Sequence, residues 1–192
     1  AAHIEAHEEV DRLLELDDRV DLVMPRGSSE FVSYIQGNTQ IPVLGHTEGI
    51  CHVYVDEAAD LEMAEDVAFD AKVQYPAVCN AVETLLVHDS VADAFLPDLV
   101  ERYEAAGVEL RGDVRNREVV DVDPATDDDW DTEYGDLELS IKVVGDAYDA
   151  IEHVNDHGSK HTESILTEDP QTAEAFMTGV DAASVFHNAS TR

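Results

Sequence analysis

Short apolar runs alternate with amphipathic segments along most of this chain. Six runs of mainly apolar residues have the length of buried strands; they are residues 51–55, 80–88, 108–110, 137–144, 163–166 and 183–186. Four segments between them carry apolar residues at helical spacing; they are residues 61–72, 91–106, 148–155 and 173–178. Strands that alternate with helices form βαβ units, so the pattern predicts an α/β fold with a mainly parallel sheet flanked by helices.

The first 45 residues show a shorter version of this pattern. Residues 2–16 and 31–37 predict helices, and residues 21–25 and 41–45 predict short strands. A turn at residues 26–30 joins the first of these strands to the second helix.

Two regions carry more local signals. In the segment 91–106, we expect Ser90 to cap the helix, Pro97 to kink it and Gly107 to end it. Residues 112–135 are irregular and rich in acidic residues, and their run of three aspartates before Trp130 predicts a solvated loop.

The charge is extreme, with 44 acidic against 11 basic side chains and a formal net charge of -33. Such a chain repels phosphates, which excludes a nucleic-acid partner. The hydrophobic content of 44% favours a folded body with an acidic surface over a disordered chain. Because molar salt screens like-charge repulsion, the composition indicates a halophilic protein; the alternative is an acidic protein from a mesophile.

No run approaches the ~20 apolar residues of a membrane span, and residues 1–5 lack the pattern of a signal peptide. We therefore expect a soluble, cytoplasmic protein without a membrane partner. The chain begins without Met inside a predicted helix, which suggests a fragment. Cys51 and Cys79 are the only cysteines and form no CxxC pair, so no structural zinc is expected.

Cys79 stands between a predicted helix and a predicted strand, beside Pro76, where catalytic loops are often found. A buried core cysteine is the alternative. Cys51 begins an alternating strand, and we interpret it as a core residue.

Three other groups are weaker candidates. The turn at residues 26–29 could hold an anion at a helix N-terminus, although an ordinary capped turn explains it as well. His157 and His161 have the spacing of metal ligands, but Gly158 and Ser159 break a helix between them, so we predict no metal site. Residues 188–192 could hold an anionic substrate, or could be a frayed end.

Taken together, six segments resemble the glutamate-5-semialdehyde dehydrogenase (γ-glutamyl phosphate reductase) family of the aldehyde dehydrogenase superfamily. They occur in the family's order and cover nearly the whole chain: DLVMPRG at 21–27, HVYVD at 52–56, PAVCNAVETLLV at 76–87, DWDTEY at 129–134, HTE at 161–163 and NASTR at 188–192. The family carries Gly where this chain has Ser28, Ala77 and Lys160.

The resemblance implies an aldehyde-dehydrogenase-like fold and NADPH-dependent reduction of L-glutamate 5-phosphate to the 5-semialdehyde, a step of proline biosynthesis. It implies a role for each of a set of residues: Cys79 as the nucleophile; Arg26, Gly27, Ser28, Ser29 and Glu133 in binding NADPH/NADP; Asn80, Asn188, Ser190, Thr191 and Arg192 in binding the substrate. His46 falls where related aldehyde oxidisers keep a glutamate base, and we assign it no role.

Because the family is about twice this length, the resemblance implies two partial domains. Residues 1–45 would be the end of the nucleotide-binding domain, and residues 46–192 most of the catalytic domain. Two other functions stay open: another member of the superfamily, such as an acylating dehydrogenase, and a non-catalytic acidic fragment. The expected partner is a small-molecule substrate, and a homo-oligomer is compatible with the resemblance.

We predict that salt stabilises this fold. At a net charge of -33, the protein should melt at a markedly lower temperature in dilute buffer than in molar KCl, because a Debye length of about 3 Å removes most of the repulsion. Thermal melts followed by circular dichroism across a KCl series measure the effect. A melting temperature that stays flat from low to high KCl would contradict the halophilic interpretation.

Overall fold

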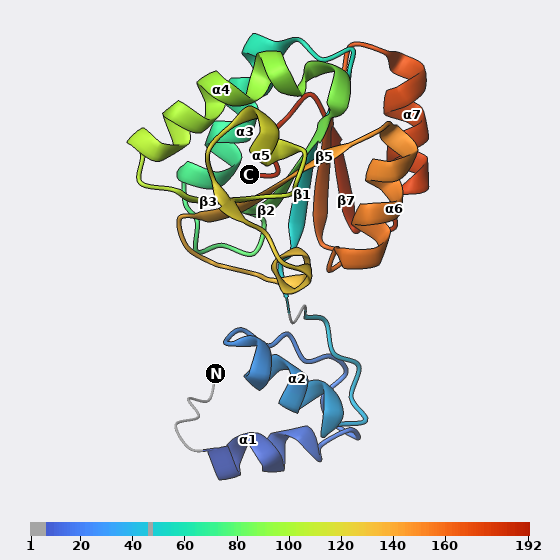
Figure 1. The fold of residues 1–192 in the computed structure, drawn as a ribbon. Helices are drawn as coiled ribbons and strands as arrows, with labels where there is room; N and C mark the ends of the chain where they lie inside the picture. Colours follow the sequence, from blue (N-terminus) through green and yellow to red (C-terminus); the bar gives the residue numbers. More distant parts are fainter. Residues whose placement is uncertain (1–6, 46–47) are drawn as a thin grey trace. The chain divides into compact units, whose positions relative to one another are not determined.

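The computed structural model describes residues 7–45 and 48–192. The chain divides into two compact units, Ala1–Glu48 and Gly49–Arg192 (Figure 1).

The first unit holds two helices, α1 (His7–Leu14) and α2 (Ser29–Gly37), as predicted for the described part of those segments. The prediction of two strands in this unit, at residues 21–25 and 41–45, is wrong. They reduce to one isolated parallel bridge between Val23 and Val43, with Val23 N donating to Pro42 O at 2.9 Å. Prolines at 25 and 42 have no N–H to donate, so the pairing cannot extend into a ladder.

The second unit is built on a seven-stranded sheet in the order β4-β3-β5-β2-β1-β6-β7. All of its strand pairs are parallel. The strands are β1 (Cys51–Val55), β2 (Val82–His88), β3 (Glu109–Gly112), β4 (Asp123–Pro124), β5 (Glu138–Val144), β6 (Thr162–Leu166) and β7 (Ser184–His187). The predicted α/β fold with a parallel sheet is therefore confirmed.

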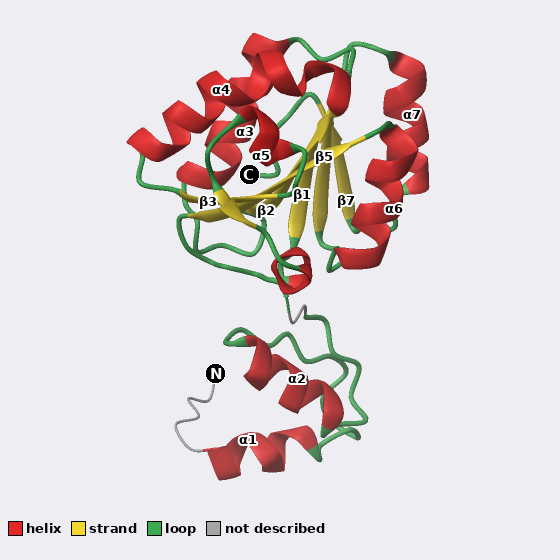
Figure 2. Cartoon of the chain, viewed as in Figure 1, coloured by secondary structure: helices red, strands yellow, loops and turns green. Residues whose placement is uncertain are grey.

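Helices cover both faces of this sheet (Figure 2). One face carries α3 (Leu61–Val73), α4 (Asp89–Ala105) and the short α5 (Asn116–Val119); the other carries α6 (Ala147–His157) and α7 (Pro170–Gly179). Side chains of one strand alternate between the two layers, so Val53 packs under α3 and α4 while Tyr54 packs under α6 and α7. All five residues of β1 are buried, as expected of a central parallel strand.

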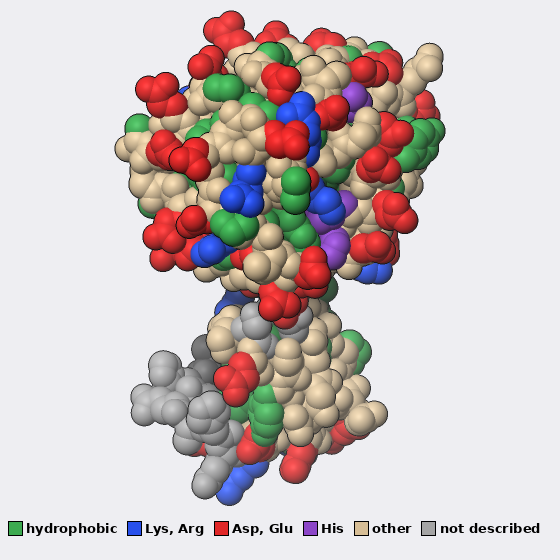
Figure 3. Space-filling model, viewed as in Figure 1, with side chains coloured by type: hydrophobic (Ala, Val, Ile, Leu, Met, Phe, Trp, Pro, Cys, Tyr) green, Lys and Arg blue, Asp and Glu red, His purple; other side chains and the backbone are tan. Residues whose placement is uncertain are grey.

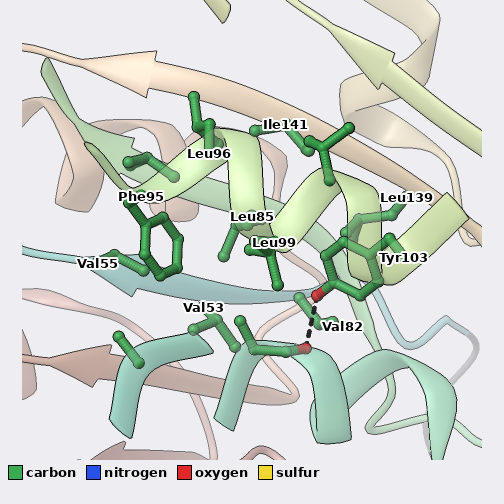
Figure 4. Packing of buried hydrophobic residues seen from close by; sticks show 14 of the residues in the cluster. Val53, Val55, Val82, Leu85, Phe95, Leu96, Leu99, Tyr103, Leu139 and Ile141 are labelled. Carbon is green, nitrogen blue, oxygen red and sulfur yellow. Dashed lines mark hydrogen bonds between the residues drawn. The ribbon is translucent and has the colours of Figure 1, made fainter. Parts of the chain in front are cut away.

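The larger core lies under α3 and α4 (Figure 4). Leu85 of β2, Leu99 of α4 and Tyr103 of α4 meet there, and Tyr103 is fully buried. Its hydroxyl donates to the carbonyl of Ala68 at 2.6 Å, which ties α4 to α3.

Two local predictions were wrong. His88, not Ser90, caps α4, because its Nδ1 accepts the N–H of Ser90 at 3.1 Å. Residues 112–135 are not a single loop, since they contain α5, β4 and a 3-10 helix η1 (Asp127–Asp131). A capping box between Thr126 and Asp129 and the burial of Trp130 give the acidic run this structure.

The prediction that Gly107 ends α4 is confirmed: it has a φ of 82°, and its N–H donates to Glu104 O at 3.0 Å. The helix runs unbroken through Pro97. Acidic side chains are spread over the visible face of the protein (Figure 3). No helix within residues 7–45 and 48–192 is long and apolar enough to cross a membrane.

A polar cluster is buried between the sheet and α6. His52 donates its backbone N–H to Glu163 Oε2 at 2.6 Å, and its Nδ1 lies 3.0 Å from the same oxygen. The ring of His153 lies 5.5 Å from the ring of His52. Lys142 donates to His153 Nδ1 at 3.0 Å, so the ring proton is assigned to Nε2. Burial lowers the pKa of His153 to about 2, with further lowering by His52 and Lys142.

We predict that His153 makes the fold sensitive to acid. Its pKa is 6.5 when unperturbed and about 2 in the fold, so its contribution to stability is complete above pH 6.5 and is lost as pH falls from 6.5 towards 2. Well below pH 6.5, the free energy of unfolding should fall by ~1.4 kcal/mol for each pH unit because of this group. His153→Phe should reduce this slope, measured as the free energy of unfolding in urea at fixed salt from pH 8 to pH 5. Equal slopes in the two proteins would refute the assignment.

Candidate active site

Cys79 lies in a loop between the end of α3 and the start of β2, at the edge where the parallel strands begin. Pro76 follows the last turn of α3 and disfavours helical backbone at Tyr75. A tight turn then forms, in which Ala81 N donates to Val78 O at 2.9 Å. Cys79 is only partly buried, so its thiol can meet a substrate from solvent.

The backbone of Cys79 rests on the segment that leads into β1. A Cβ on Gly49 would lie 2.7 Å from both Cα and C of Cys79, so only glycine fits at this position. Cys51 donates its thiol to the carbonyl of Cys79 at 3.3 Å. Burial raises the pKa of the Cys51 thiol well above its usual range. Cys51 is thus a fully buried core residue, as predicted, and is unsuited to act as a nucleophile.

The segment after β7 turns back across the sheet and reaches the Cys79 loop. It reverses at Asn188, whose φ of 52° is tolerated by asparagine. Asn188 Oδ1 accepts the N–H of Thr167 at 2.9 Å, and Ser164 donates to Ala189 O at 2.6 Å. Asn80 Nδ2 then donates to Thr191 O at 2.7 Å.

Arg192 is held against the Cys79 loop by neutral oxygens. Its guanidinium donates to Asn80 Oδ1 at 2.7 Å and to Gln74 Oε1 at 3.2 Å, and lies 6.0 Å from the Tyr75 ring centre. Ser190 Oγ accepts the backbone N–H of Arg192 at 3.2 Å. Within the described residues these contacts include no carboxylate, so the positive charge of Arg192 is available to an anion.

The structure therefore brings Asn80, Thr191 and Arg192 together beside Cys79. Asn188 and Ser190 act on the same segment by fixing its turn and its last peptide. Thr191 is 1% exposed, and its hydroxyl has no hydrogen-bond partner in the described part of the protein.

Glu133 lies on an exposed loop of the second unit. Within residues 7–45 and 48–192 its carboxylate makes no hydrogen bond or ion pair, so both oxygens can accept the hydroxyls of a ribose. The neighbouring Gly135 has a φ of 62°, and its N–H donates to Glu83 Oε1 at 3.3 Å. This contact fixes the loop that carries Glu133.

The other predicted cofactor residues belong to the first unit. Ser28 caps α2, since its Oγ accepts the N–H of Phe31 at 3.3 Å. A Cβ on Gly27 would lie 2.9 Å from the Phe31 ring, so the glycine lets the turn pack on that ring. Arg26 is exposed, and Ser29 is the first residue of α2. An exposed turn at a helix N-terminus fits a phosphate group.

His157 and His161 do not share a helix face, because α6 ends at His157 and Gly158 is extended. His157 Nδ1 contacts Asp131 at 2.8 Å, whereas His161 Nδ1 lies 2.8 Å from the Thr162 hydroxyl. In the described ranges, no group of three or more His, Cys, Asp or Glu side chains is placed to hold a metal. His46 lies outside the described residues.

Lys160 has a φ of 62°, a conformation that favours glycine. The family carries Gly at this position, and the backbone conformation gives a reason for it. Lys160 adopts it while donating to Asp181 at 2.5 Å.

Sequence reasoning missed Gly49, Gln74 and Tyr75 as parts of this site. Their contacts with Cys79 and Arg192 depend on which segments meet at the edge of the sheet. The only sequence signal was the position of Gln74 and Tyr75 between α3 and Cys79.

Comparison with known proteins defines the class of this molecule. Residues 4–128 match the aldehyde dehydrogenase family. The chain belongs to that family.

More specific relatives are proteins named gamma-glutamyl phosphate reductase. That of Natronomonas pharaonis is 68% identical over 191 residues, which cover 98% of this chain and 44% of that protein. That of Haloquadratum walsbyi is 66% identical over 197 residues, which cover 98% of this chain and 43% of that protein. The crystal structure of gamma-glutamyl phosphate reductase from Thermotoga maritima superposes with a TM-score of 0.95 at 47% identity, covering 97% of this chain and 45% of that one.

These matches confirm the resemblance to gamma-glutamyl phosphate reductases that the sequence motifs predicted. The chain spans less than half the length of the relatives it matches.

Proposed function

We propose that this chain is the part of an NADPH-dependent gamma-glutamyl phosphate reductase that carries the nucleophile, Cys79. The observation that carries the proposal is the position of Arg192 and Asn80 beside a partly exposed Cys79, in a chain 68% identical to a protein of that name. The substrate is L-glutamate 5-phosphate and the product is the 5-semialdehyde of proline biosynthesis.

The chemistry follows from the residue types. The Cys79 thiolate attacks the acyl carbon, the bond from that carbon to the phosphate oxygen breaks, and phosphate leaves with the bonding electrons. A thioester on Cys79 results. Bound NADPH supplies the hydride that this thioester accepts. The sulfur then leaves as thiolate, and the aldehyde is released.

Arg192 is proposed to bind an anionic group of the substrate while this occurs. Its guanidinium can give a bidentate contact to a carboxylate or phosphate, and Asn80 and Gln74 keep it oriented. Fixing the substrate against Cys79 raises the fraction of encounters with correct geometry.

For the cofactor, we propose that the turn of Arg26, Gly27, Ser28 and Ser29 contacts its phosphates and that Glu133 contacts a ribose. The exposed N-terminus of α2 and the unpaired Glu133 carboxylate support these roles. We also propose a salt-adapted, cytoplasmic enzyme. The net charge of -33 supports salt adaptation, as do the halophilic homologues among its relatives.

We predict that Cys79, and not Cys51, is acylated. In a full-length protein containing this chain, Cys79→Ser and Cys79→Ala should reduce turnover by several orders of magnitude and keep the fold, because no other group can form the thioester. Cys51→Ala should cost ~1–3 kcal/mol of stability and keep turnover within about tenfold. Steady-state assays with glutamate 5-phosphate, together with urea unfolding, measure both effects.

The decisive measurement is mass spectrometry of the peptide acylated by substrate. An adduct on Cys51, or normal turnover in Cys79→Ala, would overturn the assignment. Simple aldehydes and acyl-thioesters serve as comparison substrates, because faster use of these than of glutamate-derived substrates would favour an acylating dehydrogenase.

We predict that Arg192→Lys weakens substrate use much more than cofactor use. The KM for glutamate 5-phosphate should rise about 10–100-fold, because an ammonium cannot reproduce the guanidinium's paired contacts. The KM for NADPH should stay within about twofold. Arg117→Lys is the matched control, since Arg117 is exposed and donates to the carbonyl of Val122. Equal losses for substrate and cofactor would indicate a structural role for Arg192.

A further inference from the structure

A lysine and a glutamate form an ion pair inside the second unit. Lys72 Nζ lies 2.7 Å from Glu83 Oε2, and the two side chains are 0% and 1% exposed. Lys72 is the last but one residue of α3, and Glu83 is the second residue of β2. The pair thus joins the two elements that flank the Cys79 loop, at the base of that loop.

The carboxylate of Glu83 serves a third segment. Its Oε2 accepts from Lys72, and its Oε1 accepts the backbone N–H of Gly135 at 3.3 Å. Gly135 stands two residues after Glu133, on the same loop. One carboxylate therefore connects the end of α3, the start of β2 and the loop that carries Glu133.

A need for stability does not explain this pair. Removing two charges from water costs several kcal/mol per ion, and apolar side chains of similar volume often give an equal or more stable core. Burial raises the pKa of Glu83 to about 7, opposed by Lys72 and by the Gly135 N–H, and it lowers the pKa of Lys72. Both shifts express the cost of burying the charges.

We propose that the Lys72–Glu83 pair is a positioning device that sets the Cys79 loop and the Glu133 loop relative to each other. The inference rests on the proposed function of Cys79. Fixing the base of the Cys79 loop fixes the direction of the thiol, and fixing Gly135 sets the loop whose carboxylate is assigned to the cofactor ribose. Neither residue touches substrate in this role.

A second buried pair of this edge, His52 with Glu163, does not provide the same link. His52 and Glu163 lie on β1 and β6, under α6, so their contact joins two neighbouring strands. Of these two pairs, only Lys72–Glu83 spans the residues on both sides of the nucleophile.

The test uses a full-length protein containing this chain and separates positioning from stability. Lys72→Met and Glu83→Gln each break the pair, and Lys72→Met/Glu83→Leu replaces it by apolar side chains. Tyr103→Phe is the matched control, because it removes a buried hydrogen bond to α3 that does not reach the Cys79 loop. The readouts are the melting temperature, kcat, the KM for NADPH, and the rate of Cys79 alkylation by iodoacetamide.

We expect both single variants to melt at least about 5 °C lower and to lose about 10–100-fold in kcat. The apolar double variant should regain most of the melting temperature. Its kcat should stay about 10–100-fold low, with a changed alkylation rate and a KM for NADPH raised severalfold, because Gly135 has lost its acceptor. Tyr103→Phe should melt lower and keep kcat and alkylation within about twofold.

Return of kcat and alkylation to wild-type values in the double variant would show a merely structural pair and overturn the inference. The inference would also be overturned if both single variants melted lower but kept kcat and the alkylation rate within about twofold, as expected for Tyr103→Phe. Failure of the proposed function gives a different result, since wild-type protein would then form no substrate adduct on Cys79.

Discussion

The contact between Gly49 and the backbone of Cys79 is the constraint on which the site depends. Because β1 and β2 are adjacent and parallel, the segments that enter them run side by side at one edge of the sheet. A glycine on one segment allows the backbone of the other to approach, and the Cys51 thiol then holds the Cys79 carbonyl at 3.3 Å. The position of Cys79 is therefore set by strand order and by the absence of one side chain.

Most strands of the second unit could be predicted from the sequence because apolar residues recur along short segments, as Leu85, Leu86 and Val87 do in β2, which is buried along nearly its whole length. The segments around Pro25 and Pro42 have similar composition, yet they lack the N–H groups and the partners that a ladder needs. Residues 112–135 were missed because their structure depends on caps such as Thr126 with Asp129. Cys79 and Arg192 were predicted as site residues from sequence motifs, whereas Gly49 acts through a contact that no local pattern records.

The distribution of charge gives Arg192 its special position. In a chain with 44 acidic side chains, a cation readily finds a carboxylate, and Arg102, Arg111 and Arg115 each do so. Arg192 instead meets the amide oxygens of Asn80 and Gln74. These neutral partners orient the guanidinium without neutralising it, which is the condition for binding an anionic ligand in a protein whose surface repels anions.

High salt acts differently on the surface and on the buried pairs. Exposed pairs such as Lys160 with Asp181 lie in solvent that molar salt screens over about 3 Å, so they contribute little under such conditions. The pairs of Lys72 with Glu83 and of His52 with Glu163 are buried from both solvent and ions. Screening that relieves repulsion between surface carboxylates therefore leaves these buried pairs almost unchanged. An acidic surface and an ordered Cys79 loop are compatible because the Lys72–Glu83 pair, at the base of that loop, lies inside the protein.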